Sequence, residues 1–330
     1  MQQMTGIALV TGASGFVGSH LMRRLAPTGR SLRALYHATP PASQVSTPNV
    51  EWVAADLAAC DCEPLVRGVA TVFHVAGVAI MTSGPEETAR MDLVNTEATL
   101  RLAQASKRAG VRQFIFVSSV DAGEQGATPE LDEQHGEPIR AYGRSKRRAE
   151  GALMALSSAD FAVTILRPSV LFGEDHLGSV HDLARGIARG RFALIGRGDN
   201  RMNFYYIGDF IDVLAGVEGK VAAFGELFIA ADQPQTVREF ATELAAQVNP
   251  GFRIPSIPRV IGSLAGATFD VAALILRRPM PLSRRRVGRM VRDLAYSNTR
   301  LARVLGMRPV IGWRQGLRQT TDWYRRQGLL

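Results

Sequence analysis

The sequence predicts an α/β fold in which a doubly wound parallel sheet is followed by a smaller C-terminal domain. Short apolar runs alternate with helical patterns as far as residue 166, and a glycine-rich turn joins the first run to the first helix. After residue 167 the alternation loosens into Gly-rich and Arg-rich segments. A length of 330 residues, with 46% hydrophobic and 21% charged residues, suits a globular chain of about two domains and excludes a disordered or fibrous protein.

The predicted strands are runs of β-branched and apolar residues separated by helical patterns. They cover residues 7–10, 32–36, 50–54, 71–75, 114–117 and 162–166. Between the fourth and fifth strands, Met91, Val94, Ala98 and Leu102 recur at helical spacing and Gly110 supplies a stop, which predicts a helix over 86–109. This alternation is typical of a parallel sheet with helices on both faces.

The second half of the chain carries a weaker pattern. We expect residues 1–170 to form the first domain, with a segment near 203–232 returning to it, and residues 171–330 to form mainly the second, substrate-binding domain. Thr236 and Glu239 form a capping box ahead of an apolar helical pattern. The sequence therefore predicts a helix that begins at this point in the second domain.

Targeting and metal-binding signals are sparse. The N-terminal residues lack the pattern of a signal peptide, and no stretch reaches the 18 or so uncharged apolar residues of a membrane-spanning helix. We therefore expect a cytoplasmic protein. Cys60 and Cys62 are too close for an ordinary disulfide and too few for a zinc framework, so we expect two free thiols and no metal site.

The net charge of +9 is concentrated near the C-terminus, where residues 277–326 contain 14 arginines and two acids. Such a segment could attract phosphate-bearing ligands, nucleic acid or an anionic membrane, but we interpret it as a solvated surface and expect no nucleic-acid partner. The preceding apolar stretch, within residues 258–286, could lie on an anionic membrane surface. We expect it instead to pack inside the second domain as a wall of the substrate pocket, because Asp270 interrupts its apolar stripe.

The glycine turn follows the first strand directly, within Thr11-Gly-Ala-Ser-Gly-Phe-Val-Gly18. Gly12 permits a tight turn, Gly15 lets backbone N–H groups approach a pyrophosphate, and Gly18 allows close packing of helix and strand. In the first βαβ unit this pattern is typical of a dinucleotide-binding Rossmann fold. The residues expected to bind the cofactor here are Gly12, Ser14, Gly15, Phe16, Val17 and Gly18.

The end of the second strand bears on the choice of cofactor. Folds that prefer NAD usually place an acid about 20 residues beyond the glycines, whereas this chain has Leu35-Tyr-His37. Arg33 and His37 could meet a 2′-phosphate, so we expect NADP to be preferred over NAD, although Arg33 could equally be an ordinary strand residue. Asp56 could bind the adenine amino group or cap a helix. The expected cofactor site also includes Leu57, Ala76, Tyr142 and Lys146.

A serine and a tyrosine–lysine pair suggest the chemistry. Ser118 and Ser119 end the fifth strand, and Tyr142 and Lys146 lie at i, i+4 on the helix that precedes the sixth, so they share a face. We expect the lysine to lower the pKa of the phenol from its ordinary value of about 10, which makes the tyrosine a general acid or base. A serine hydroxyl can hold the carbonyl or alcohol oxygen while a nicotinamide exchanges hydride.

These motifs, together with Val72–Gly77, Asn95 and Arg167-Pro168 followed by Gly173, resemble an extended short-chain dehydrogenase/reductase over nearly the whole chain. The resemblance implies that the three glycines bind the cofactor pyrophosphate. It also implies that Ser119, Tyr142 and Lys146 are catalytic and that Lys146 holds the nicotinamide ribose. Finally, it implies a homodimer that pairs the helices around residues 88–109 and 142–156.

The motif at the sixth strand separates branches of this family. Nucleotide-sugar enzymes usually carry Asn three residues after its arginine, and this chain has Val170 there. Leu166-Arg-Pro-Ser-Val-Leu-Phe-Gly-Glu174 instead resembles the 3β-hydroxysteroid dehydrogenase and dihydroflavonol reductase-like branch. We therefore expect an NAD(P)-dependent oxidoreductase that interconverts a secondary alcohol and a ketone on a lipophilic small-molecule substrate. Arg201 matches a diphosphate-binding arginine of the sugar enzymes, which keeps a nucleotide-sugar epimerase, dehydratase or reductase as the alternative.

Overall fold

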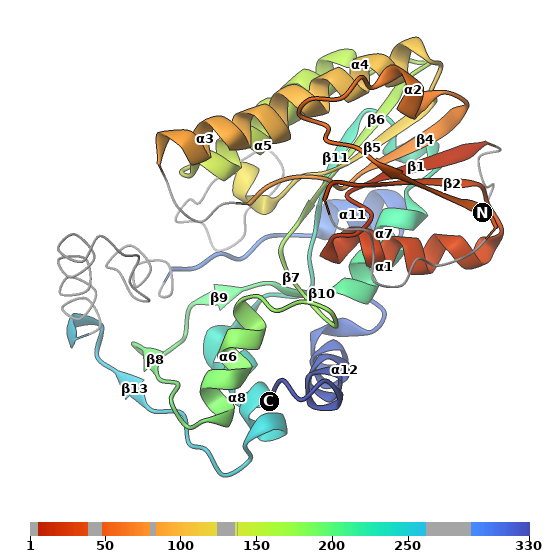
Figure 1. The fold of residues 1–330 in the computed structure, drawn as a ribbon. Coiled ribbons are helices and arrows are strands. Elements are labelled where there is room, and N and C mark those ends of the chain that lie inside the picture. The colour runs from red at the N-terminus through yellow and green to blue at the C-terminus, as the bar shows by residue number, and fades with distance from the viewer. Residues whose placement is uncertain (1–5, 39–47, 80–83, 124–135, 137, 262–291) are drawn as a thin grey trace.

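A seven-stranded parallel sheet forms the centre of the molecule in a computed structural model that describes residues 6–38, 48–79, 84–123, 136, 138–261 and 292–330 (Figure 1). The strand order is β11-β6-β5-β4-β1-β2-β3, which confirms the doubly wound α/β fold. The strands are β1 (Ile7–Thr11), β2 (Leu32–Tyr36), β3 (Val50–Ala54), β4 (Val69–His74), β5 (Gln113–Val117), β6 (Ala162–Pro168) and β11 (Glu226–Ala230).

Helices cover both faces of the sheet. One face packs against α1 (Phe16–Leu25), α7 (Ile207–Gly216) and α11 (Thr299–Leu305), and the other against α2 (Glu63–Val66), α4 (Thr99–Arg108) and α5 (Ala141–Leu156) (Figure 1). Successive strand residues point to opposite faces. Ala8 and Val10 therefore lie in the apolar core on the α1 side of the sheet, and Leu9 lies in the core on the α4 side. Strands with apolar residues on both faces are buried on both sides.

The helix predicted over 86–109 is confirmed with one change. It consists of α3 (Pro85–Asp92), a π-helical segment (Leu93–Ala98) and α4. Segments of π-helix are frequent at functional sites, and this one contains the fully buried Asn95. The spacing of hydrophobic residues could not reveal the extra residue in each hydrogen-bonded turn of the π-helical segment.

The chain returns to the sheet after residue 203. β7 (Val170–Phe172) pairs with β10 (Phe204–Tyr206), α7 follows, and β11 pairs with β6 in parallel at the edge of the sheet. The short 3₁₀ turn η4 (Val221–Ala223) lies between α7 and β11, while η3 (Val120–Ala122) follows β5 and η1 (Ala26–Thr28) follows α1. The seventh strand was not among those predicted.

A smaller group of elements lies below the carboxyl ends of the strands in Figure 1. It contains α6 (Ser179–Ala188), β8 (Leu194–Ile195), β9 (Arg201–Met202), β12 (Gln235–Thr236), α8 (Val237–Val248), β13 (Ser256–Ile257) and α12 (Gly312–Arg326). The capping box of Thr236 and Glu239 is confirmed at the start of α8. The Asp209 carboxylate accepts three backbone N–H groups from residues 310–312, and this anchors the start of α12.

Other sequence expectations concern the surface. Cys60 and Cys62 are both free. None of the described helices is long and apolar enough to cross a membrane. The apolar and cationic stretch at 258–286 lies outside the described residues from residue 262 onward, and its first part exposes Val260 and Ile261.

Candidate active site

A cleft of about 860 Å³ opens at the carboxyl ends of the strands, beside the start of α1. It brings together nearly all of the predicted site residues. Those lining it are Gly12, Ser14, Gly15, Phe16, Val17, Gly18, His37, Asp56, Leu57, Ala76, Ser119, Tyr142 and Lys146. Ligands of open α/β sheets bind at this edge.

Arg33 does not belong to the cleft, and this corrects the expectation that it meets a 2′-phosphate. Its Nε donates to the Glu51 carboxylate at 2.8 Å. Its Nη1 donates to the carbonyl oxygens of Leu65, at 2.8 Å, and Arg67, at 3.1 Å, just before β4 begins. Arg33 is the second residue of β2, so its guanidinium stabilises the side of the sheet at which the strands begin. This side is called the amino edge below, and the side at which the strands end is called the carboxyl edge.

The glycine turn has the geometry that a dinucleotide needs. Gly12 has φ +65°, and a Cβ there would lie 2.9 Å from the Ala76 Cα atom. A Cβ at Gly18 would lie 2.0 Å from the Gly12 carbonyl oxygen. The helix begins after Gly15 with no acidic residue in its first turn, so its positive end is left for an anion.

His37 and Asp56 face each other at the end of the cleft formed by β2 and β3. The His37 Nε2 atom lies 3.6 Å from the Asp56 carboxylate, and both side chains are more than half exposed. The other Asp56 oxygen accepts the Ala58 N–H in a tight turn. An anionic ligand at this end of the cleft would meet one imidazole and one carboxylate side by side.

Tyr142 and Ser119 meet because α5 approaches η3 closely. A Cβ at Gly143 would lie 2.0 Å from the Asp121 carbonyl oxygen, so only glycine permits this approach. The Ser119 hydroxyl accepts the Asp121 N–H at 3.1 Å and also hydrogen-bonds the phenol of Tyr142. The role of Gly143 was missed, although its position directly after Tyr142 was visible in the sequence.

The expected direction of the Tyr142 pKa is wrong for this structure. Burial, reinforced by the negative charge of Asp121, raises the pKa of Tyr142 to about 12, while the hydrogen bond with Ser119 and the charge of Arg140 oppose the rise only in part. Arg140 pairs with the Asp121 carboxylate. The phenol therefore holds its proton at neutral pH, as a general acid must.

Lys146 lies in a buried setting beneath the cleft. Its Nζ atom donates to the Val117 carbonyl at 3.0 Å and lies 4.7 Å from the centre of the Phe116 ring. Burial lowers the pKa of Lys146 to about 8, and the negative charge of Glu150 opposes this. A Cβ at Gly77 would lie 3.0 Å from the same nitrogen, so backbone of the segment after β4 closes over the lysine.

Asn95 and His74 fix this segment. The Asn95 side chain exchanges two hydrogen bonds with the backbone of Val78 and donates to the Ser145 hydroxyl. His74 bridges the hydroxyls of Thr11 and Thr99, each at 2.8 Å. The Thr11 hydroxyl already accepts two backbone N–H groups, so it donates to Nδ1 of a neutral His74. Burial, with the nearby charge of Lys146, lowers the pKa of His74 to about 3.

Arg201 does not line the cleft. It is an exposed residue of β9, and its backbone N–H donates to Asp293. Most of the cleft lining is apolar and includes Leu93, Val94 and Leu171. Within the described part of the chain, no group of three or more His, Cys, Asp or Glu side chains is placed to hold a metal ion.

Known proteins resemble this chain in sequence and in fold. The chain is 28% identical, over 90% of its length and 89% of the relative, to an N-acetyl-alpha-D-glucosaminyl-diphospho-ditrans,octacis-undecaprenol 4-epimerase of Escherichia coli O157:H7. It is 28% identical, over 97% of its length and 90% of the relative, to a 3 beta-hydroxysteroid dehydrogenase/Delta 5-->4-isomerase of Mycobacterium tuberculosis. The structure of MoeE5 in complex with UDP-glucose and NAD superposes with a TM-score of 0.77 at 24% identity, over 98% of this chain and 99% of MoeE5.

The family comparison covers the sheet and the cleft. The NAD dependent epimerase/dehydratase family matches residues 8–223, which contain the glycine turn, Ser119, Tyr142 and Lys146. The chain therefore belongs to the NAD-dependent epimerase/dehydratase family and is an enzyme of the extended short-chain dehydrogenase/reductase type.

Proposed function

We propose that this enzyme interconverts a secondary alcohol and a ketone on a lipophilic substrate by hydride transfer. The proposal is carried by the place of the Tyr142 phenol, which hydrogen-bonds Ser119 inside a mostly apolar cleft where burial raises its pKa to about 12. A phenol that keeps its proton at neutral pH suits reduction of a ketone, in which the oxygen must receive a proton. When bound, the nicotinamide supplies the hydride.

The chain's own residues provide the remaining functions. Gly12, Gly15 and the first turn of α1 would hold the pyrophosphate, and Lys146 would hold the nicotinamide ribose. Ser119 orients the substrate oxygen toward the phenol, because its hydroxyl already hydrogen-bonds Tyr142 and a backbone N–H. The apolar lining excludes water, which strengthens these polar contacts.

A nucleotide-sugar epimerase is the second candidate. It is favoured by the relatives, since MoeE5 was solved with UDP-glucose and NAD and a 26% identical protein of Vibrio cholerae is a UDP-glucose 4-epimerase. Against it stand Val170, which cannot donate a hydrogen bond from its side chain, and Arg201, which lies outside the cleft. These observations lead us to place the lipophilic substrate first.

A substrate screen with a matched inactive variant tests the proposal. Lipophilic ketones should be reduced, and Tyr142→Phe should lower turnover by about 10² or more because general acid catalysis contributes 10²–10⁴. Dinucleotide affinity, measured by calorimetry, should stay nearly unchanged in the variant. Turnover of UDP-sugars but not of ketones would favour the second candidate, and near-parental activity of Tyr142→Phe would reject the mechanism.

For the cofactor, we propose that NAD and NADP bind within about tenfold of each other. With Arg33 bonded at the amino edge, only His37 remains of the two side chains expected at the 2′-phosphate, and it faces the Asp56 carboxylate. A hydrogen bond from the imidazole to the 2′-phosphate and repulsion of that phosphate by the carboxylate offset each other. A preference for NADP therefore has little support beyond His37.

We also propose that the protein is cytoplasmic and that its second domain, mainly residues 171–330, binds the substrate.

We further propose a homodimer formed through α4 and α5. Gly151 lies exposed on α5, and a Cβ there would meet no atom within 4 Å. Gly151→Arg thus fits one chain but should block a partner at this helix. Light scattering should give twice the chain mass of 35.8 kDa for the parent and the single mass for Gly151→Arg. Gly251→Arg, at an equally open position in the second half of the chain, should remain dimeric.

A further inference from the structure

Helix α5 contacts the end of β5 through three side chains spaced one turn apart. Tyr142 hydrogen-bonds the Ser119 side chain. Lys146 donates to the Val117 carbonyl at 3.0 Å. Glu150 accepts the Ser118 hydroxyl at 2.6 Å. Residues 142, 146 and 150 share a helix face, so together they set the register of α5 against the strand end that carries Ser119.

Glu150 is itself fixed from the neighbouring strand. Arg167, near the end of β6, donates from Nε to one carboxylate oxygen at 2.7 Å and from Nη2 to the other at 2.6 Å. The exposed fractions are 3% for Glu150 and 1% for Arg167. A bidentate pair in such a dry setting holds both side chains in one geometry.

The charges around Lys146 give Glu150 a second role. Lys146 faces His74 from β4, which is neutral, and Tyr142 lies one turn away on its own helix. The negative charge of Glu150 favours the protonated form of Lys146. The same carboxylate also forms ion pairs with Arg167 and with Arg147, whose Nη1 atom lies 3.9 Å away. Burial alone would drive Lys146 toward its neutral form.

We propose that Glu150 is a positioning residue that holds the catalytic helix in register with Ser119 and places a negative charge one helical turn from Lys146. This role rests on the proposed function only for its effect on turnover. It differs from a purely structural ion pair, because loss of the Glu150 charge changes the protonation of another residue.

The first test measures Lys146 directly and needs no turnover. The chain has three lysines, Lys107, Lys146 and Lys220, so a protein labelled with ¹³C at lysine Cε gives three signals, which Lys107→Arg and Lys220→Arg assign. The Lys146 signal of the parent should titrate near pH 8. In Glu150→Gln its midpoint should fall by about one pH unit or more.

Glu218→Gln is the matched control, because Glu218 forms another buried pair, with Arg30, at the opposite end of the strands, and the replacement weakens that pair in the same way. Its Lys146 midpoint should equal that of the parent. A midpoint in Glu150→Gln within about 0.3 pH units of the parent, well under the one to three units that a nearby opposite charge produces, would overturn the electrostatic role.

The second test separates position from charge. Glu150→Asp keeps the charge and the partner Arg167, so it should fold even where Glu150→Gln does not. Its Lys146 midpoint should stay near that of the parent, but the shorter side chain cannot reach Ser118 and Arg167 together. We expect kcat to fall about tenfold with the KM for the dinucleotide unchanged. Parental kcat in Glu150→Asp would overturn the positioning role. Failure of the proposed function would be seen in a different variant, because Tyr142→Phe would then remain active.

Discussion

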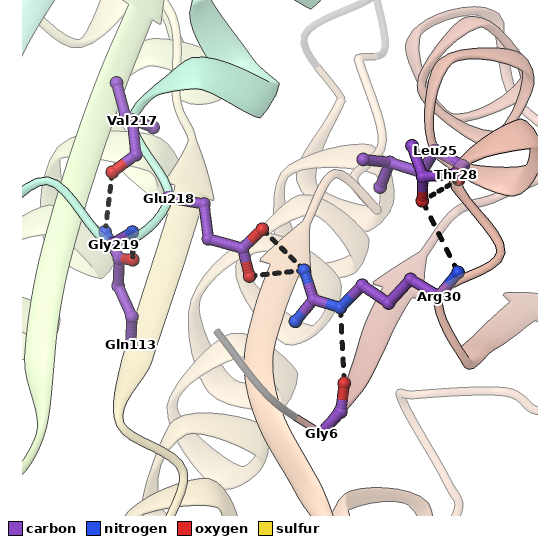
Figure 2. Close-up of polar contacts among 8 residues, drawn as sticks. All are labelled: Gly6, Leu25, Thr28, Arg30, Gln113, Val217, Glu218 and Gly219. Atoms are coloured by element: carbon purple, nitrogen blue, oxygen red, sulfur yellow. Dashed lines mark hydrogen bonds and ion pairs between the residues drawn. The ribbon is translucent and has the colours of Figure 1, made fainter. Parts of the chain in front are cut away.

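Two buried arginine–glutamate pairs lie at opposite ends of the strands of the same sheet, one at the amino edge and one at the carboxyl edge. At the amino edge, Arg30 precedes β2 and its Nη1 atom donates to both carboxylate oxygens of Glu218, at 2.6 and 2.5 Å (Figure 2). The two side chains are only 6% and 7% exposed. At the carboxyl edge, Arg167 and Glu150 form the pair described above, in an even drier setting.

The neighbours of the two pairs differ. Arg30 also donates to the Gly6 carbonyl, but its Nη2 atom is buried without a hydrogen-bond partner among the described residues. The residue after Glu218, Gly219, donates its N–H to the Gln113 side chain at the start of β5 (Figure 2). These contacts join loops to one another and to the start of β5, whereas the Glu150 carboxylate contacts Ser118 at the strand end that carries Ser119. Similar chemistry thus holds the fold at one edge and the active site at the other.

The largest expected effect comes from breaking each pair. Arg30→Met and Arg167→Met should each lower the free energy of unfolding by about 3–5 kcal/mol, because a buried carboxylate is left without its partner. The double replacements Arg30→Met/Glu218→Leu and Arg167→Met/Glu150→Leu should recover most of that loss. Denaturant unfolding measures both.

Activity should then separate the two edges. The double variant at the amino edge should keep parental turnover, and the one at the carboxyl edge should lose about tenfold or more even when it is fully folded. Equal turnover in the two folded double variants would remove the distinction between the edges.

A second, smaller effect concerns acid. His74 at the carboxyl edge has a folded-state pKa of about 3 against an ordinary value of 6.5, so the unfolded chain takes up its proton first. The stability this group contributes is present above pH 6.5 and is lost as the pH falls toward 3. Between pH 6.5 and 5 the loss should be about 2 kcal/mol.

The His74→Asn variant isolates this group from other acid effects. Its side chain can still offer one acceptor and one donor but does not titrate. Its free energy of unfolding should therefore fall by about 2 kcal/mol less than that of the parent over the same pH range. Parallel curves for the two proteins would mean that His74 takes up its proton without unfolding the chain.

Much of the fold was predictable because its signals are local. Each of the six predicted strands appears, since apolar runs between turn signals are a property of adjacent residues. The cleft was predictable from the position of the motifs at strand ends. β11 lies within the segment near 203–232 that was expected to return to the first domain, but it was not predicted as a strand. The π-helical segment was missed because it depends on one added residue within each hydrogen-bonded turn.

Errors at the site have a different cause. The direction of the Tyr142 pKa depends on burial and on Asp121, which the helix spacing of Tyr142 and Lys146 does not contain. The place of Arg33 depends on which end of β2 it occupies. Glu150 stands four residues after Lys146, so its position on the same face was visible, but its partner Arg167 comes from another strand. Partners distant in sequence are what the pattern lacks.

The smallest expected effect compares two residues near the ends of one strand. Arg33 and His37 are four residues apart, which places them about 13 Å from each other along β2. Arg33→Ala should leave the affinities for NADPH and NADH unchanged, because its guanidinium is bonded at the amino edge. His37→Ala should weaken NADPH binding by less than about tenfold, or 1.4 kcal/mol, and leave NADH binding unaffected, since a contact from an exposed side chain to a phosphate contributes little. Calorimetric titration of both dinucleotides decides the matter. A selective loss of NADPH binding in Arg33→Ala would mean that this side chain leaves Glu51 to reach the ligand, and the division between the two edges would then fail at β2.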